Sequence, residues 1–267
     1  MTKAKAKDGG TRRSTSKKPA QPATRLQREA AMMNLERLVA ERESVPDVAL
    51  PIPPKDLLAR YERLASAIVS DVLREHCLLD QAFPGTLVAL RPERCFAGVA
   101  FTVKSAPNTR ITGEMTFRVE MLEAMHEDAV VVWDTSGDTR GTMWGGVMTA
   151  TVHAKGVRGA VIDGGIRDTR QILDKDFPVL YRYRSPNGSL GRCLITHYQI
   201  PVQIGDVLVR PGDIIVGDAD GAVAVPRALA LAVLERAEAI VANERKIFDW
   251  VAAGETVKDI TDKGGYF

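Results

Sequence analysis

The sequence predicts a mixed α/β (α+β) protein, and two patterns carry this prediction. Apolar residues recur at three- and four-residue steps from Leu57 to Val72, the spacing of a helix with one face in the core. Two β-branched runs, residues 130–133 and 160–162, flank a helical stretch, which is typical of a βαβ unit with parallel strands. With 267 residues, 45% of them hydrophobic and 26% charged, the chain is long enough to bury a sizeable core.

Composition also narrows the class of protein. No apolar run approaches the roughly 20 residues needed to cross a bilayer, so we expect no membrane span. The N-terminus lacks the apolar core of a secretory signal, and the three cysteines are scattered without C-x-x-C spacing. These features predict a cytoplasmic protein without a disulfide framework.

Charge is distributed unevenly along the chain. Residues 1–25 hold eight basic side chains and one acid, Asp8, a charge of +7, which leaves −5 on the remaining residues of a chain with net charge +2. We expect a disordered basic arm that acts as a solubilising or non-specific tether. It contains no aromatic residue to stack on bases, so nucleic-acid contact is expected to be at most non-specific.

The elements before the βαβ unit follow from periodicity. Residues 26–42 predict one amphipathic helix, and four prolines within residues 45–54 predict an extended connector, so that a segment 26–54 leads to a body beginning at Lys55. A helix is predicted from there to about His76, and residues 98–103 predict a buried strand. The next helix, residues 114–126, places an apolar stripe on one face that we assign to the core: Met115, Val119, Leu122 and Met125.

The βαβ unit brings two distant segments together. Its helix, residues 145–155, ends at Gly156, and after the second strand residues 163–165 predict a tight turn into a helix opening near Asp168. Parallel strands would place residues 134–146 and 163–168 at one carboxyl edge, where open α/β sheets bind ligands.

The C-terminal part predicts short strands and a long helix. Residues 179–183, 202–204, 207–209, 214–216 and 222–225 read as an antiparallel meander or hairpins. Residues 228–250 predict an amphipathic helix, which completes a domain spanning 55–250, and residues 251–267 form a tail.

The strongest chemical signal is the end of the second strand. Arg167 offers a fork of donors suited to a carboxylate or an enolate, and Asp168 offers hard oxygens to Mg²⁺ or Mn²⁺. Gly145 and Gly146 open the preceding helix, whose first amides can bind an anion. The alternative from spacing alone is that Arg167 and Asp168 are ordinary residues at the start of a helix.

These segments resemble the RraA-like family, which includes class II pyruvate aldolases. The resemblance rests on residues 143–150 and 155–168, supported by residues 68–73, 96–103 and 207–226, and covers about 55–250. It implies an αββα sandwich and a homotrimer or homohexamer.

By this resemblance, Arg167 would bind the pyruvyl group and stabilise its enolate, and Asp168 would ligate Mg²⁺ or Mn²⁺. The substrate carboxylate would lie on the amides of Val147 and Met148, next to Gly145 and Gly146. The implied reaction is metal-dependent cleavage of a 4-hydroxy-2-oxoacid to pyruvate, with oxaloacetate decarboxylation as a side activity.

Two positions depart from the aldolase pattern, which has acidic residues where this chain has Gly146 and Gln171. Glu244, Asp138 and Asp163 are the candidates to replace the missing carboxylates. The departures also fit the alternative function within the family, a non-catalytic protein that binds and regulates a ribonuclease. A quinone methyltransferase, a label that this family has carried, lacks support because no glycine-rich cofactor loop follows an early strand.

Overall fold

The computed structural model describes residues 24–45 and 47–266, and the chain divides into two compact units, residues 1–42 and 43–267. The predicted basic arm, residues 1–25, lies outside the described residues except for its last two. The predicted domain bounds of 55–250 stay a prediction.

The first unit contains two helices where one was predicted. α1 (Arg25–Met32) begins with a capping box, in which Thr24 and Gln27 each bond the other's backbone amide. α2 (Glu36–Glu43) follows. The single helix over 26–42 is wrong because Asn34 adopts a left-handed conformation, φ 56°, that interrupts the α-helical backbone.

The predicted helix from Lys55 to His76 is likewise two helices, α3 (Pro54–Tyr61) and α4 (Ser66–Glu75). Their apolar stripe is buried as predicted. A residue far along the chain stabilises the start of α4. Asp218 accepts hydrogen bonds from both the amide and the hydroxyl of Ser66, at 2.7 and 2.8 Å.

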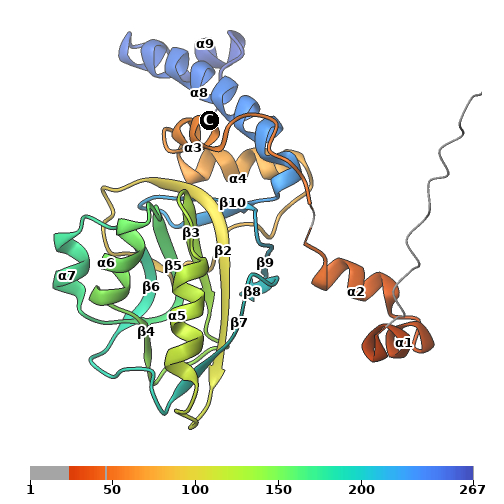
Figure 1. The fold of residues 1–267 in the computed structure, drawn as a ribbon. Helices are drawn as coiled ribbons and strands as arrows, with labels where there is room; N and C mark the ends of the chain where they lie inside the picture. The colour runs from red at the N-terminus through yellow and green to blue at the C-terminus, as the bar shows by residue number, and fades with distance from the viewer. Residues whose placement is uncertain (1–23, 46, 267) are drawn as a thin grey trace, which may run out of the picture. The chain divides into compact units, whose positions relative to one another are not determined.

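Within the described residues, nine strands form one strongly curved sheet (Figure 1). Seven lie in the order β1 (Val88–Ala89), β6 (Val179–Arg184), β5 (Gly159–Ile166), β3 (Ala129–Asp134), β2 (Phe96–Pro107), β10 (Ile214–Gly217) and β11 (Ala222–Val225). Two shorter partners join from the sides: β4 (Thr142–Trp144) pairs with β5, and β7 (Cys193–Tyr198) pairs with β2. β8 (Val202–Ile204) and β9 (Val207–Val209) form a separate hairpin.

The predicted βαβ unit is confirmed. β3 and β5 are parallel, with Trp133 opposite Ile162, and α6 (Gly146–Ala154) lies between them in the chain. The predicted turn at 163–165 is wrong, because β5 continues to Ile166. Glycine is needed at 165 because a Cβ there would lie 2.5 Å from Cε2 of Tyr183 on β6 and 2.9 Å from the carbonyl oxygen of Gly141.

The C-terminal strands were predicted in part. β8 with β9 and β10 with β11 are antiparallel hairpins as expected. β6 instead pairs in parallel with β5, and β7 was not predicted. The long helix is α8 (Ala230–Ala252), preceded by the short helix η1 (Arg227–Leu229), and the predicted tail contains α9 (Val257–Asp262).

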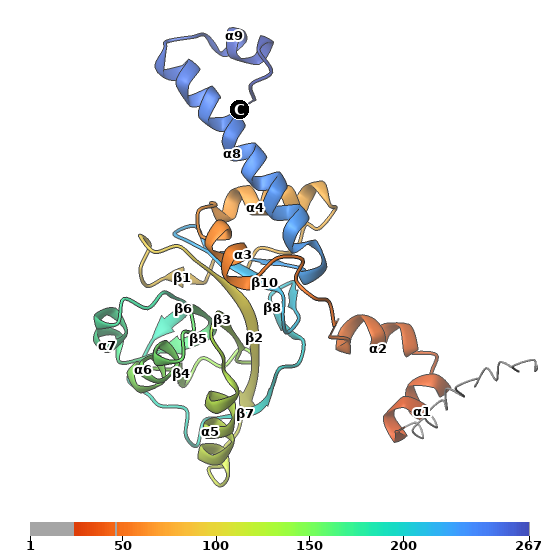
Figure 2. The same cartoon turned by 45° about the horizontal axis from the view of Figure 1, so that its top comes forward.

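Helices cover the sheet in two groups (Figures 1 and 2). α5 (Glu114–Ala124), α6 and α7 (Thr169–Asp174) cover one face, where alternate strand residues such as Val131 and Trp133 point. α3, α4 and α8 share a second core, in which α4 contacts β10 and β11, α3 contacts β2, and α8 packs on α3 and α4. The mixed α/β class and its sandwiched layers are confirmed, and they place the carboxyl ends of β4 and β5 next to α5 and α6.

The core stripe predicted on α5 is confirmed for two residues and wrong for two. Met125 is buried and Leu122 packs against the core, but Met115 and Val119 are each 54% exposed. Met121 and Glu114 of the same helix are completely buried instead. No helix in the described part of the chain has the length and apolar character to cross a membrane. The cytoplasmic location stays a prediction.

Candidate active site

Two strand-to-helix corners lie side by side at the carboxyl edge of the sheet. β4 leads into α6 and β5 leads into α7, and the pairing of Trp144 with Ile166 holds the two corners together. The amide of Arg167 donates to the carbonyl oxygen of Trp144 at 3.0 Å. The structure therefore brings the predicted residues Gly145 and Gly146 next to Arg167 and Asp168, which are about twenty positions away in the sequence.

Asp168 has a constrained geometry. Its backbone is left-handed, φ 54°, which turns the chain from β5 into α7. Its Oδ2 accepts a hydrogen bond from the amide of Gly146 at 3.2 Å and lies 3.6 Å from Nε of Arg167. Both side chains stay accessible, with 47% of Arg167 and 37% of Asp168 exposed, so that a ligand can reach them.

The first turn of α6 presents free amide donors. Its first helical hydrogen bond runs from the amide of Thr149 to the carbonyl oxygen of Gly145 at 3.0 Å. Helix geometry thus leaves the amides of Val147 and Met148 without an acceptor inside α6, and the helix dipole favours an anion beside them.

Three glycines allow the close packing around these groups. A Cβ on Gly145 would lie 2.8 Å from Oδ2 of Asp168, and a Cβ on Gly188 would lie 2.9 Å from Nη1 of Arg167. A Cβ on Gly146 would lie 1.9 Å from Oε1 of Gln171. The two positions that depart from the aldolase pattern therefore face each other, and the Gln171 amide occupies the space that a side chain at 146 needs.

These groups open into a pocket of about 330 Å³ between α5, α6 and the loop before β7. Its lining is Met115, Arg118, Leu122, Thr142, Met143, Trp144, Gly145, Val147, Met148, Arg167, Asp168, Ser189 and Leu190. Four of the predicted substrate-binding residues line this pocket: Gly145, Val147, Met148 and Arg167. Gly146 does not line it, but its amide bonds the carboxylate of Asp168, which does. Ser189 and Leu190 come from the loop of residues 185–192, which connects β6 to β7.

Arg118 also lines the pocket, although the sequence did not predict it. Its Nη2 donates to Oε1 of Glu114 at 2.5 Å and to Oγ of Ser189 at 3.0 Å. Glu114 is completely buried and also accepts from the amide of Ile195 at 3.2 Å. The available signal was the i, i+4 spacing of Glu114 and Arg118, but that spacing equally describes a solvent-exposed pair.

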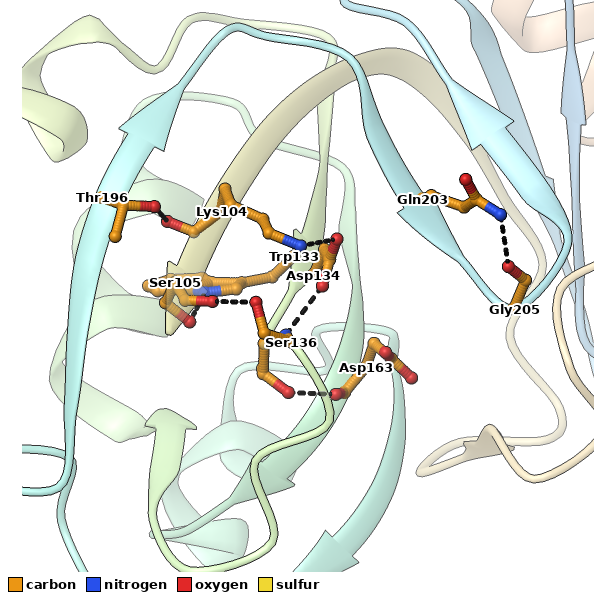
Figure 3. A network of polar contacts seen from close by, with 10 residues as sticks. Lys104, Ser105, Trp133, Asp134, Ser136, Asp163, Thr196, Gln203 and Gly205 are labelled. Atoms are coloured by element: carbon orange, nitrogen blue, oxygen red, sulfur yellow. Dashed lines mark hydrogen bonds and ion pairs between the residues drawn. The ribbon is translucent and has the colours of Figure 1, made fainter. Parts of the chain in front are cut away.

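A polar network anchors the segment after β3 (Figure 3). Ser136 donates through its hydroxyl to the carbonyl oxygen of Ser105 at 2.7 Å and through its amide to Oδ1 of Asp134 at 2.7 Å. Lys104 pairs with Oδ2 of the same carboxylate at 2.5 Å, and Nε1 of Trp133 donates to Oγ of Ser105 at 3.0 Å. This network fixes the loop at the edge of the sheet and does not line the pocket.

The candidates to replace the missing carboxylates are absent from the described lining of the pocket. Asp163 is buried in an ion pair with Arg182, and burial raises the pKa of its carboxyl group although the guanidinium opposes this. Asp138 is buried and accepts from the amide of Gly141 at 2.9 Å, and Glu244 lies on α8. Asp168 is the carboxylate that this lining offers to a ligand.

The residues present suit a divalent cation that is bound by few protein ligands. No cluster of three or more His, Cys, Asp or Glu side chains that could enclose a metal occurs among the described residues. Mg²⁺, however, is often held by one or two carboxylates together with water and substrate oxygens. Asp168 has one oxygen held by the Gly146 amide and a partly exposed side chain, which suits that sparse mode of binding.

Comparison with known proteins assigns the family. Residues 66–224 match the RraA-like family, described as Aldolase/RraA, and the chain belongs to this family. A relative from Halalkalibacterium halodurans, described as a putative 4-hydroxy-4-methyl-2-oxoglutarate aldolase, is 30% identical over 205 residues, 74% of this chain and 91% of its own length.

Two solved structures share the fold. A chain described as novel cellulases from microbes associated with the gut ecosystem is 58% identical, with a TM-score of 0.79 over 82% of this chain and 99% of its own. Streptomyces coelicolor RraAS2, described as an unusual member of the RNase ES inhibitor RraA protein family, is 26% identical, with a TM-score of 0.65 over 75% of this chain and 98% of its own.

Proposed function

We propose that the protein is a divalent-metal-dependent aldolase that cleaves a 4-hydroxy-2-oxoacid to pyruvate and decarboxylates oxaloacetate as a side activity. The observation that carries the proposal is the convergence of Arg167, Asp168 and the first turn of α6 on one pocket. The relatives described as putative aldolases support the same reaction class.

The residues suit a reaction that builds negative charge on an oxoacid. The amides of Val147 and Met148 would hold the carboxylate at the positive end of α6. Arg167 would donate to the 2-oxo oxygen, whose charge grows as the bond between C3 and C4 breaks, so that its hydrogen bonds strengthen in the transition state. No lysine stands in the described lining, which favours this route over one through a Schiff base.

Asp168 would hold Mg²⁺ or Mn²⁺. The cation, when bound, supplies Lewis-acid stabilisation of the developing negative charge. The protein's part is to aim the carboxylate, and two features do so: the left-handed backbone of Asp168 and the hydrogen bond from the Gly146 amide. Arg167 lies beside the same carboxylate and would neutralise charge there as well.

A glycosidase, suggested by the description of the 58% identical structure, fits the pocket poorly. Hydrolysis of a glycosidic bond uses two carboxyl groups facing the substrate, about 5 to 9.5 Å apart. Asp168 is the carboxyl group in the described lining. Glu114 is close in the fold but is completely buried in its ion pair with Arg118, so it does not face a substrate.

The experiment that tests the proposal measures pyruvate release with a coupled lactate dehydrogenase assay. Substrates are oxaloacetate and a panel of 4-hydroxy-2-oxoacids, each with Mg²⁺, Mn²⁺ or EDTA. We expect metal-dependent turnover that falls at least about 100-fold in Arg167→Ala and in Asp168→Asn, because each removes charge stabilisation from the transition state. Asparagine is used at 168 because it tolerates the left-handed backbone.

Arg170→Ala and Asp174→Asn are the matched controls, because both residues are exposed on α7 and neither lines the pocket. They are expected to keep wild-type rates. Full cleavage by the folded Arg167 or Asp168 variant would refute the site assignment.

A second candidate function is non-catalytic regulation of a ribonuclease. Gly146 and Gln171 stand where aldolases of the resemblance carry carboxylates, and RraAS2 is described as belonging to an RNase ES inhibitor family. Inhibition of a purified RNase ES-type enzyme, together with no pyruvate release from the whole panel, would favour this function. For either function we propose a homotrimer or homohexamer, which sedimentation equilibrium would measure.

A further inference from the structure

Arg118 brings a second guanidinium to the pocket, and the proposed cleavage chemistry does not use it. Arg118 and Arg167 both line the cavity, Arg118 from α5 and Arg167 from the end of β5. The side chain of Arg118 is 12% exposed, so its charge is largely withdrawn from bulk water. A charged group placed in this way interacts more strongly with an ionic ligand than a surface arginine does.

The contacts of Arg118 leave part of it available to a ligand. Its Nη2 is held by Glu114 and Ser189. Its Nη1 lies 3.4 Å from Sδ of Met148, and a thioether sulfur is only a weak acceptor. Nη1 therefore keeps donor capacity on the side where Met148 lines the cavity.

Glu114 fixes the direction of this donor. It is completely buried, and its second oxygen accepts from the amide of Ile195 on β7. A guanidinium anchored at one end in this way is oriented before a ligand arrives, which lowers the entropy lost on binding. The geometry of a guanidinium also matches that of a carboxylate, which can accept two parallel hydrogen bonds from it.

We propose that Arg118 is a specificity-determining residue that binds a second acidic group of the oxoacid, separate from the carboxylate held by the α6 amides. The inference rests on the proposed function and deepens it, because it selects 2-oxo dicarboxylates over 2-oxo monocarboxylates. The apolar side chains of the lining, Met115, Leu122 and Leu190, offer no hydrogen bond to a second carboxylate, so its recognition falls to a charged donor such as Arg118.

The test compares two ligands of equal length, 2-oxoglutarate and 2-oxopentanoate, by calorimetric titration with Mg²⁺ present. Wild-type protein is expected to bind 2-oxoglutarate about 10- to 100-fold more tightly, the range of one charge-assisted hydrogen-bonded contact. Arg118→Met should reduce this ratio to near 1 by weakening 2-oxoglutarate alone. Arg118→Lys should retain an intermediate ratio, because it keeps the charge and loses the fork.

A separate variant is needed to distinguish lost recognition from misfolding, because removing Arg118 alone leaves the charge of Glu114 buried without its partner. The double variant Glu114→Gln/Arg118→Met removes both charges and should show the same loss of preference. Arg170→Met is the matched control, because Arg170 is exposed on α7 and lies outside the described lining of the pocket. It should keep the wild-type ratio.

Equal binding of the two ligands by wild-type protein would overturn the inference, and so would a preference that survives in the double variant or disappears only in Arg170→Met. The same experiments can refute the proposed function independently of the role of Arg118. A preference that depends on Arg118, without pyruvate release from any substrate, would leave recognition standing and refute catalysis, whereas pyruvate release without a preference would refute the role of Arg118 alone.

Discussion

Arg167 depends on Gly188, a glycine outside the described lining of the pocket. Nη1 of Arg167 lies 2.9 Å from the position of a Cβ on Gly188, so Gly188→Ala must push the guanidinium aside. We expect kcat/KM for pyruvate release to fall about 10- to 100-fold, since a displacement of about 1 Å in a positioning group costs that much. The free energy of unfolding should change little, because the displaced atom is the tip of a flexible side chain.

Gly85→Ala is the matched control for Gly188, because a Cβ at Gly85 would meet nothing within 4 Å. It should leave both the rate and the stability unchanged. A Gly188→Ala protein with wild-type kcat/KM would contradict the position assigned to Arg167.

Gly146 and Gln171 should be energetically coupled. A Cβ at 146 would lie 1.9 Å from Oε1 and 2.8 Å from Cβ of Gln171, so Gly146→Ala should lower the free energy of unfolding by about 1–3 kcal/mol, the usual cost of overpacking. Gln171→Ala removes the nearer contact and leaves the Cβ contact. In a double-mutant cycle by urea unfolding, the two substitutions together should cost less than the sum of each alone. Additive costs would show that Gln171 moves away freely.

The sequence placed the catalytic candidates better than the rest of the pocket. Arg167 and Asp168 follow a recognisable strand, and parallel pairing was enough to bring Gly145 beside them. Arg118 could not be found in this way, because its place in the pocket depends on Ser189 and on the burial of Glu114 under β7, contacts that span 71 and 81 positions.

At the scale of elements, long regular strands were predictable and interruptions were not. β3 and β5 carry β-branched runs that only a buried strand explains. The break between α3 and α4 contains neither glycine nor proline, at residues 62–65, and is set by the bonds from Ser66 to Asp218, 152 positions away. β4 has three residues, too few for a periodic pattern, and exists because it pairs with β5.

β6 holds the loop before β4 through one tyrosine, which gives an alkaline pH dependence. The hydroxyl of Tyr183 donates to the carbonyl oxygen of Gly141 at 2.6 Å, and burial raises the pKa of Tyr183 to about 12. The folded protein therefore retains this proton where the unfolded chain, with a pKa near 10, loses it. The stability from this group is complete below about pH 10 and is lost as the pH rises toward about 12.

Tyr183→Phe removes both effects. We expect a loss of about 1 kcal/mol at neutral pH from the missing hydrogen bond, and a shallower fall in the free energy of unfolding between about pH 10 and 12. Urea unfolding across this range measures both quantities. An unchanged slope in the variant would show that other groups carry the alkaline dependence.

At the scale of the whole molecule, the family match, the described pocket lining and the core clusters belong to the unit of residues 43–267. The sheet joins segments that are far apart in sequence, so the site depends on the complete fold of this unit. Residues 43–54 make tertiary contacts with the rest of this unit. Leu50 and Ile52 pack on the core of α3, α4 and α8, and the guanidinium of Arg227 donates to the carbonyl oxygen of Val48.

Deletion of residues 1–42 should therefore leave the catalytic unit intact. We expect unchanged pyruvate release and an unfolding free energy within about 0.5 kcal/mol of the full chain, as for changes remote from a core. A deletion through residue 52 is the control, and it should destabilise the protein by about 2–5 kcal/mol because it strips two apolar side chains from the core. If the shorter deletion folds normally and loses pyruvate release, the basic N-terminal segment takes part in catalysis. If it instead loses only inhibition of a ribonuclease, the segment contacts that partner.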